Sequence, residues 1–449
     1  MIRSRINWLW KVDQAATGIM VVLAFLFLGT HSSALAQQSV TTANARQAVV
    51  SGPRVVTVNN LPHRAGQTRA GWTAPRPHNG LTDAQWKQLK ARASKLPDPN
   101  GYGATGKAFP GPGHAPDTPG PFAEGGPFPG QDEDLSCSGG VPSDMALAVG
   151  QNHVVQVVND CMSIYEKLTG TLLQGPISLN DLFSSHSIPP NNNSQFITDP
   201  RAMYDFVARR FVVTAIWEDF PHSKGIILLA ASQSDDPTGP WNTYVFGVGT
   251  TGQCPDFPTM GQASANDPFI GAIYIGINIF PCNSDGFIKT EALVSNTVLF
   301  APKGPIYAGQ NAFSSYEAFD LKVNGSLVDT IQPVNVSEWG QKPRTEFAVS
   351  SFNINFGNGS CTSPCNGLVI WSFANTLFQA GTPGPVITSS VVSTPSNYVL
   401  PADADQPTPA GKPPFAFDNS IATNDTRIVS AASRPLSRRV DEPVFFAGG

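Results

Sequence analysis

The stretch VPSDMALAVGQNHVVQVVND, Val141 to Asp160, contains the feature that decides the fold. In it an acidic residue, Asp144, opens a short apolar run that ends in small or polar residues. The same arrangement recurs four times, opening at Asp199, Asp256, Glu346 and Asp425. A unit of a few short strands cannot bury its own apolar face and must pack against copies of itself. The recurrence therefore predicts an array of similar β units.

The runs inside these units are short, β-branched and aromatic, and Gly, Pro, Asn and Asp bound them, as is typical of strands. Their nearly continuous apolar character suits sheets that are covered on both faces. We expect adjacent strands at residues 154–158 and 162–166, 211–217 and 225–232, 272–278 and 289–294, and 347–352 and 367–373.

Residues 132–449 divide into five units of about 64 residues, which fits four short strands and their loops. We expect an all-β fold, a β-propeller with five blades. Six blades are the alternative, because residues 300–346 have room for a degenerate one. A β-sandwich is the structural rival, but it would not explain the recurring acid. The polar, arginine-rich ending after Asp425 predicts an incomplete last blade, unless a strand from near the other terminus completes it.

The N-terminal residues 1–36 have the pattern of a secretory signal peptide. Basic residues precede the apolar stretch 19–28, and Ala34 and Ala36 form a small-x-small cleavage signature. That apolar core is about half as long as a membrane span requires. We expect a secreted or periplasmic protein that starts near Gln37 and has no membrane span after cleavage.

Residues 37–131 are rich in turn formers, as in FPGPGHAPDTPGPFAEGGPFPG at 109–130. This composition predicts an extended Pro/Gly-rich tether. One short helix is expected within it, because Thr82 can cap an N-terminus, apolar residues recur at helical spacing from Trp86 to Ala93, and Pro97 stops the pattern.

Six cysteines in an exported chain predict three disulfides, since that compartment is oxidising. Nearest-neighbour pairing keeps each bridge within one unit and is our choice among fifteen connectivities. A zinc site would need thiolates and histidines at short, regular spacing, which only the last two cysteines approach. The expected pairs are Cys137 with Cys161, Cys254 with Cys282, and Cys361 with Cys365.

Charged residues form 14% of the chain and the formal net charge is −5. This balance offers no electrostatic footprint for a phosphate backbone, so no nucleic-acid partner is expected. The sequence contains no Walker loop, dinucleotide fingerprint or HExxH motif, and we expect no cofactor.

Four segments, VPSDMALAVGQNHVVQVVND, DPRAMYDFVARRFVV, PDFPTMG and NDTRIVSA, resemble a set of exported bacterial β-propeller proteins of mostly unassigned function, in which acids begin successive blades. The resemblance covers residues 141–431 and informs the fold more than the activity. In addition, SDDPTGPW at 234–241 resembles the Asp-box turn of sialidase-type propellers, although Gly239 sits one residue late. Its role there is structural, because Asp236 accepts backbone hydrogen bonds and Trp241 packs between blades.

Equivalent positions of radial blades converge on a central channel, so Asp144, Asp199, Asp256 and Glu346 are candidate catalytic residues. Crowded carboxyls repel one another and separate their pKa values, as glycosidic cleavage requires. A positional similarity to five-bladed glycosidases of the arabinanase type implies a base or nucleophile at Asp144, a pKa modulator at Asp199 and an acid at Glu346.

Two other interpretations of the acids stay open. Each acid can cap an inner strand or pair with an arginine, for which the candidates are Arg201, Arg344 and Arg427. A ring of oxygen ligands for Ca²⁺ is the other, although no loop has calcium-type spacing. The histidines His153, His186 and His222 are interpreted as ordinary loop or strand residues.

Our first functional expectation is an exported propeller that binds a ligand or partner, such as a polysaccharide or another exported protein, at its channel mouth and loops. The alternative is a glycoside hydrolase that uses the ring of carboxylates. The sequence leaves open whether the protein is an enzyme.

Overall fold

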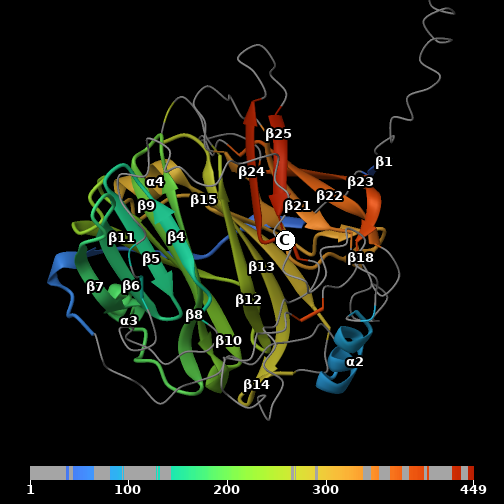
Figure 1. Cartoon of the computed structure of the whole chain (residues 1–449), viewed down its shortest axis with the longest axis horizontal. Helices are drawn as coiled ribbons and strands as arrows, with labels where there is room; N and C mark the ends of the chain where they lie inside the picture. Colours follow the sequence, from blue (N-terminus) through green and yellow to red (C-terminus); the bar gives the residue numbers. More distant parts are fainter. Residues whose placement is uncertain are drawn as a thin grey trace, which may run out of the picture.

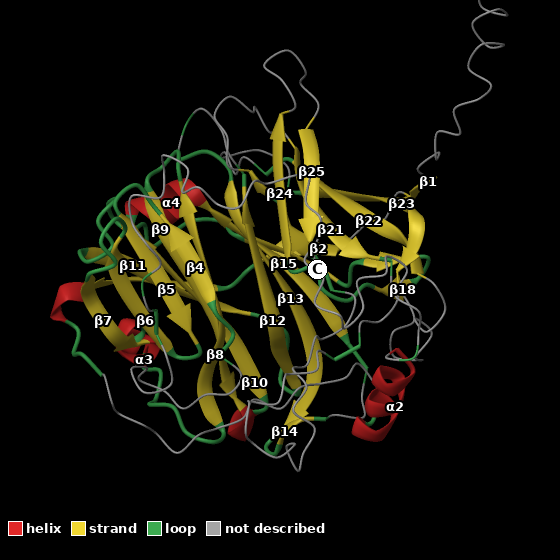
Figure 2. Cartoon of the chain, in the orientation of Figure 1, coloured by secondary structure: helices red, strands yellow, loops and turns green. Residues whose placement is uncertain are grey.

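The computed structural model describes residues 37–39, 44–64, 81–93, 95, 128, 130–131, 143–263, 267, 269–288, 292–336, 345–352, 365–376, 384–398, 402–403, 427–435 and 443–448. These ranges are mostly strand with few helices (Figure 2). Within them, no helix is long and apolar enough to cross a membrane. The predicted signal peptide, Cys137, Cys361, Arg344 and Asp425 lie outside the described residues.

Four groups of antiparallel strands, each called a sheet below, follow one another along the chain, and a parallel bridge between Lys224 and Gln253 joins the second and third groups. The first contains β4 (Ala146–Val149), β5 (His153–Val158), β6 (Cys161–Glu166) and β7 (Leu172–Ser178). The second contains β8 (Gln195–Asp205), β9 (Arg210–Asp219), β10 (Lys224–Ser232) and β11 (Pro240–Gly247). The third contains β12 (Gln253–Gln262), β13 (Ala272–Asn283), β15 (Ser295–Pro302) and β16 (Tyr316–Phe319). The fourth contains β19 (Gln332–Pro333), β21 (Thr345–Ser351), β22 (Cys365–Ala374) and β23 (Val386–Tyr398).

Shorter elements complete the described fold. A hairpin of β24 (Ser430–Pro435) and β25 (Pro443–Gly448) follows the fourth sheet, and β20 (Asn335–Val336) pairs in parallel with both β12 and β24. The remaining elements are β14 (Gly286–Phe287), β17 (Lys322–Val323), β18 (Ser326–Leu327), α3 (Leu179–Leu182), α4 (Lys303–Ala308) and the 3-10 turns at Val58–Asn60, Ser184–His186 and Phe220–His222.

The sheets succeed one another across Figure 1 from green on the left to orange on the right. Each begins with an inner strand, β4, β8, β12 or β19, and proceeds outward by antiparallel neighbours. The predicted strands are present, except the one at 289–294: residues 292–294 belong to no strand, residues 289–291 lie outside the described residues, and β15 begins at Ser295. This repeated sheet, packed face to face with its neighbours, is the architecture of a β-propeller.

The hydrophobic core lies between sheets. Along β9, Phe211, Val213 and Ala215 face the cluster shared with the first sheet, while Val212 and Ile216 face the cluster shared with the third. Successive strand residues point to opposite faces, so a strand that contacts a neighbour on each side needs apolar residues at both parities. This explains the continuous apolar runs in the sequence.

Residues 37–39 and 44–64, the N-terminal belt, pair with the outer sheet edges instead of forming a free tether. Strand β1 (Gln37–Ser39) pairs with β23, β2 (Asn44–Gln47) with β16, and β3 (Val50–Thr57) with β11. Beyond β3, Arg64 donates two hydrogen bonds of 2.8 and 2.9 Å to Asp181, beside the first sheet. The belt therefore contacts the four sheets in reverse order, because backbone groups of an outer edge strand pair with any extended segment.

The helix expected from Thr82 is present as α2 (Asp83–Ala93), lower right in Figure 1. The backbone N–H of Thr82 donates to Gln85 Oε1 at 2.8 Å, and the backbone N–H of Gln85 donates to Thr82 Oγ1 at 3.3 Å. This reciprocal pair is a capping box, which satisfies two N–H groups that have no partner inside the helix.

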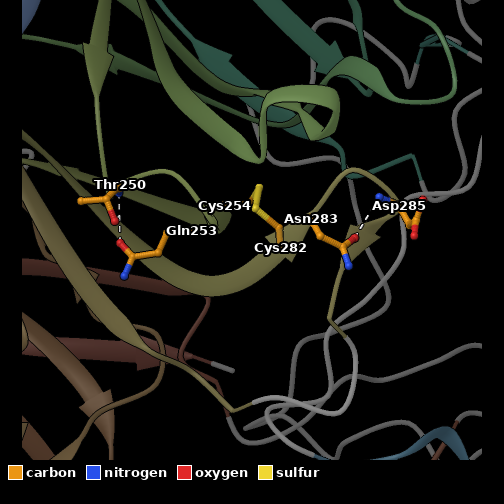
Figure 3. Close-up of a disulfide and its surroundings, with 6 residues drawn as sticks. All are labelled: Thr250, Gln253, Cys254, Cys282, Asn283 and Asp285. Atoms are coloured by element: carbon orange, nitrogen blue, oxygen red, sulfur yellow. Dashed lines mark hydrogen bonds between the residues drawn. A yellow bond between two sulfur atoms is a disulfide. The ribbon is translucent and has the colours of Figure 1, made fainter.

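Cys254 in β12 and Cys282 in β13 form the predicted disulfide (Figure 3), with their Cα atoms 5.7 Å apart. Side chains hold the two turns at this end of the strand pair, one before β12 and one after β13: Thr250 N–H donates to Gln253 Oε1, and Asp285 N–H donates to Asn283 Oδ1. Cys161 is also disulfide-bonded, but its partner lies outside the described residues. The predicted bridge between Cys361 and Cys365 is not described, because Cys361 lies outside these residues.

Candidate functional site

Each of the four sheets has a residue with left-handed backbone at or just before its inner strand. The φ angles are 40° at Asp144, 52° at Asp199, 50° at Phe257 and 48° at Thr330. In β8 and β12 the pairing register shifts at this point, which marks a bulge. A bulge re-aims side chains at the end of a ladder, so the repeat is a device for presenting polar groups at the inner strands.

Asn159, which follows β5, links the first two acids. Its Nδ2 donates to Asp144 Oδ2 at 2.7 Å, and its Oδ1 accepts the backbone N–H of Asp199 at 2.9 Å. An acid from the first sheet and an acid from the second are thus held by one amide. Asn159 had no recognisable sequence signal, because its role depends on the contact between the two sheets.

The second acid is joined to the third sheet. Asp199 Oδ2 accepts the backbone N–H of Phe257 at 3.1 Å, and Asp199 Oδ1 accepts the hydroxyl of Thr198 at 3.0 Å. Asp256 directly precedes Phe257 and, within the described residues, its carboxyl accepts no hydrogen bond. Asp199 is therefore held by donors, whereas Asp256 is the more available of the two carboxyls.

The inner-strand acids interact electrostatically. Burial, then the negative charge of Asp199, raises the pKa of Asp256 to about 7, and the charges of Asp329 and Asp144 add to the effect. Arg427 acts in the opposite direction and lowers it. Asp256 is therefore near half-protonation at neutral pH, the condition for exchanging a proton with a substrate.

Glu218, on β9, extends this group of carboxyls. It is buried, and desolvation followed by the charges of Asp256 and Asp199 holds its pKa well above the usual range. Because burial of a carboxylate without a nearby cation is unfavourable, the protonated form of Glu218 is favoured. We refer to Asp144, Asp199, Asp256 and Asp329 as the hub carboxyls, and Glu218 interacts with two of them.

The fourth sheet uses a different acid from the one that the sequence predicted. Asp329 precedes the left-handed Thr330, and Asn278 binds both: its Nδ2 donates to Asp329 Oδ1 and its Oδ1 accepts Thr330 N–H, each at 2.8 Å. Gly276 makes the approach of this segment feasible, because a Cβ there would lie 2.0 Å from the carbonyl oxygen of Ile331. The pair Asp329-Thr330 repeats Asp425-Thr426 and was the available signal.

Glu346 lies apart from the other three predicted acids. It is on β21, the second strand of its sheet, and is 1% exposed. Desolvation holds its pKa well above the usual range, with Phe347 N–H and Lys303 opposing. Tyr274 of the third sheet responds to its charge, so Glu346 belongs to the packing between the third and fourth sheets. An acid near the start of a unit need not lie on its inner strand.

Two arginines lie beside Phe257, the residue that follows Asp256. The guanidinium carbon of Arg201 lies 5.1 Å from the centre of the Phe257 ring, and that of Arg427 lies 4.6 Å from it. Guanidinium groups are attracted to aromatic faces, so Phe257 holds both near the carboxyls. Of the predicted arginine partners, Arg427 thus acts on Asp256, while Arg201 donates to the carbonyl of Pro200.

The other residues that the sequence singled out make packing contacts or hydrogen bonds within the fold. The Asp-box-like turn forms as predicted, with Asp236 Oδ1 accepting Thr238 N–H at 2.9 Å and Trp241 buried between the first two sheets. His186 contacts Thr243, and burial lowers its pKa. His222 contacts Asp219. Within the described chain, no cluster of three or more acids, histidines or cysteines could hold a metal ion, which leaves the calcium interpretation without ligands there.

The chain matches no family model and none of the curated proteins. Among solved structures, it is similar to a subtype N11 neuraminidase-like protein from a flat-faced bat H18N11 strain, with TM-score 0.33 and 12% identity over 71% of this chain and 68% of that one. It is also similar to a GH43 endo-arabinanase from Bacillus licheniformis, with TM-score 0.26 and 12% identity over 57% and 79%. An exo-1,5-alpha-L-arabinanase from a bovine ruminal metagenomic library gives TM-score 0.27 and 9% identity over 68% and 86%. At these scores the likeness assigns no activity to the chain.

Proposed function

We propose that this protein is a glycoside hydrolase whose inner-strand carboxyls cleave a glycosidic bond. The observation that carries the proposal is that two neighbouring carboxyls, those of Asp199 and Asp256, have different environments. Asp199 accepts two hydrogen bonds, whereas Asp256 accepts none among the described residues and has a pKa raised to about 7. Separated pKa values in adjacent acids are the condition for assigning one as acid and another as base or nucleophile.

The proposed roles follow from these environments. Asp256, protonated in part at neutral pH, is the general acid that protonates the leaving-group oxygen. Asp199 modulates the pKa of Asp256 through its negative charge, which is the largest contribution after burial. Asp144, fixed by Asn159, is the base or nucleophile on the other side of the scissile bond. Asp256 thus takes the role that the sequence assigned to Glu346.

The test is hydrolysis of arabinans, xylans, sialosides and polygalacturonate by the purified protein, with single variants of each acid. We expect Asp144→Asn and Asp256→Asn to lose about a hundredfold or more of kcat/KM, the usual contribution of a general acid or base. Glu346→Gln should retain activity, because Glu346 is remote from the hub. Asp236→Asn, in the exposed Asp-box-like turn, is the matched control. No turnover of any glycan by the unaltered protein would contradict the proposal.

A binding platform without chemistry is the second candidate. The hydrogen bonds of Asp144 and Asp199 favour it, since acids that only connect neighbouring sheets have their hydrogen-bonding capacity filled by protein groups. Under this alternative, Asp144→Asn and Asp199→Asn lower the melting temperature, and the unaltered protein binds glycans without cleaving them.

We further propose that the ring has five blades, with β24 and β25 forming the fifth, and that the protein acts after export. The disulfide between Cys254 and Cys282 supports export, because disulfides persist in oxidising compartments. Mass spectrometry of the protein recovered from its native source tests the proposed cleavage after Ala36, which predicts an N-terminus at Gln37.

A further inference from the structure

A cavity of about 470 Å³ is lined by residues of the inner strands β8, β12 and β19 and by residues 429–432. Its size is within the range of small-molecule sites. Arg201 and Met203 of β8 line it, two and four residues beyond Asp199 on the same strand. Ala202 of β8 also lines it, together with Met260 and Gln332 of the third and fourth sheets, Asn335 of β20, and Val429, Ser430, Ala431 and Ala432 of β24 and the residue before it.

Two polar groups of the cavity have unused hydrogen-bonding capacity within the described residues. The Oδ1 atom of Asn335 is buried and accepts no hydrogen bond within the described part of the chain. Arg201 donates one hydrogen bond, to the carbonyl of Pro200, and forms no ion pair with any described residue. A buried acceptor without a partner destabilises the fold, so a native site that retains one is suited to a ligand that donates to it.

The other lining residues are fixed or apolar. Gln332 Nε2 donates hydrogen bonds to the carbonyls of Met260 and Pro333, at 3.1 and 2.7 Å, and these bonds fix the orientation of its side chain. Met203 and Met260 supply polarisable thioethers that adapt to an irregular apolar surface. Among the described lining residues Arg201 is the only charged one, so they give the cavity a positive charge.

We propose that this cavity binds a sugar unit that carries a carboxylate, such as a hexuronic acid. Arg201 can hold the carboxylate with two parallel N–H···O bonds, which a neutral sugar cannot use. Asn335 Oδ1 accepts a hydroxyl of the ring, and the two methionines contact its apolar faces. The inference deepens the proposed hydrolase, since Arg201 lies two residues beyond Asp199 on β8. It rests on that function only for cleavage of the bound sugar, not for its binding.

The experiment measures binding of D-galacturonate and D-glucuronate by calorimetry, against D-galactose and D-glucose as neutral counterparts. These monosaccharides have no glycosidic bond, so the result does not depend on catalysis. We expect the uronates to bind more tightly than the neutral sugars, and their affinity to fall with added salt. Equal affinity for both kinds of sugar, or binding of neither, would overturn the inference.

Variants locate the site. Arg201→Gln should weaken uronate binding about tenfold or more, the worth of a charge-assisted hydrogen bond, and leave neutral-sugar binding unchanged. Arg92→Gln, an exposed arginine of α2, is the matched control. If Arg201→Gln does not fold, Asn335→Leu serves instead and should weaken both kinds of sugar. Unchanged uronate affinity in a folded Arg201→Gln protein would also overturn the inference. Uronate binding without hydrolysis of any glycan would leave the cavity assigned and remove the hydrolase.

Discussion

At the scale of single residues, the function of each hub acid depends on its neighbours and hardly on its own type. Asp199 and Asp256 are both aspartates beside a bulge, but donors from Thr198 and Phe257 stabilise the first carboxylate, while burial and repulsion favour the protonated second one. Coulomb interactions are several times stronger in a partly buried site than in water. One carboxyl can therefore differ in protonation from an identical neighbour.

The raised pKa of Asp256 predicts how stability changes with pH. Folding takes up a proton at Asp256 between roughly pH 4, the pKa of an exposed aspartate, and the folded-state value of about 7. Stability is therefore lost as pH rises through this window. Asp256→Asn removes the ionisable group, so its melting temperature should exceed that of the unaltered protein by more at pH 8 than at pH 5. A difference that is constant, or larger at pH 5, would refute this assignment.

At the scale of elements, each inner strand has a break in its regular β conformation, in the strand or just before it. A regular strand alternates its side chains between two faces, and the left-handed residues Asp144, Asp199, Phe257 and Thr330 break that alternation. Three of the associated acids, Asp144, Asp199 and Asp256, are among those that the sequence predicted. It missed Asp329 because β19 has only two residues, and no long apolar run follows the acid to draw attention to it.

The disulfide acts on the element that presents Asp256. Cys254 lies two residues before Asp256 on β12, and the bridge to Cys282 closes a separation of 28 residues. The double variant Cys254→Ser, Cys282→Ser should lower the free energy of unfolding by about 2–4 kcal/mol in urea titrations, mainly by releasing the unfolded chain. Dithiothreitol should produce a comparable loss in the unaltered protein. Equal stability of the variant and the oxidised protein would contradict the prediction.

At the scale of the whole molecule, the N-terminal belt covers sheet edges. Outer strands β23, β16 and β11 would each expose unpaired backbone groups without β1, β2 and β3. Exposed edges are templates for pairing with other chains. The belt is accordingly a protective and stabilising element, which its turn-rich composition conceals.

Removing the belt strands tests this role. A chain that begins at Val58 should melt at a lower temperature and aggregate more readily than a chain that begins at Gln37, because three edges lose their partners. Light scattering during a thermal ramp measures both effects, and the chain that begins at Gln37 is the control. If the two chains melted and scattered alike, the belt would have no such role.

The sequence by itself determined the class of the fold, most strand positions, the capped helix at 83–93 and the pairing of Cys254 with Cys282, because periodicity, turn residues and cysteine spacing are local properties. Only the tertiary structure decided which acids meet. Asp329 joins the hub and Glu346 does not, since convergence depends on the strand order within each sheet. The belt, the Asn159 bridge and the arginine-lined cavity were likewise decided by contacts between segments far apart in the sequence, which no local pattern records.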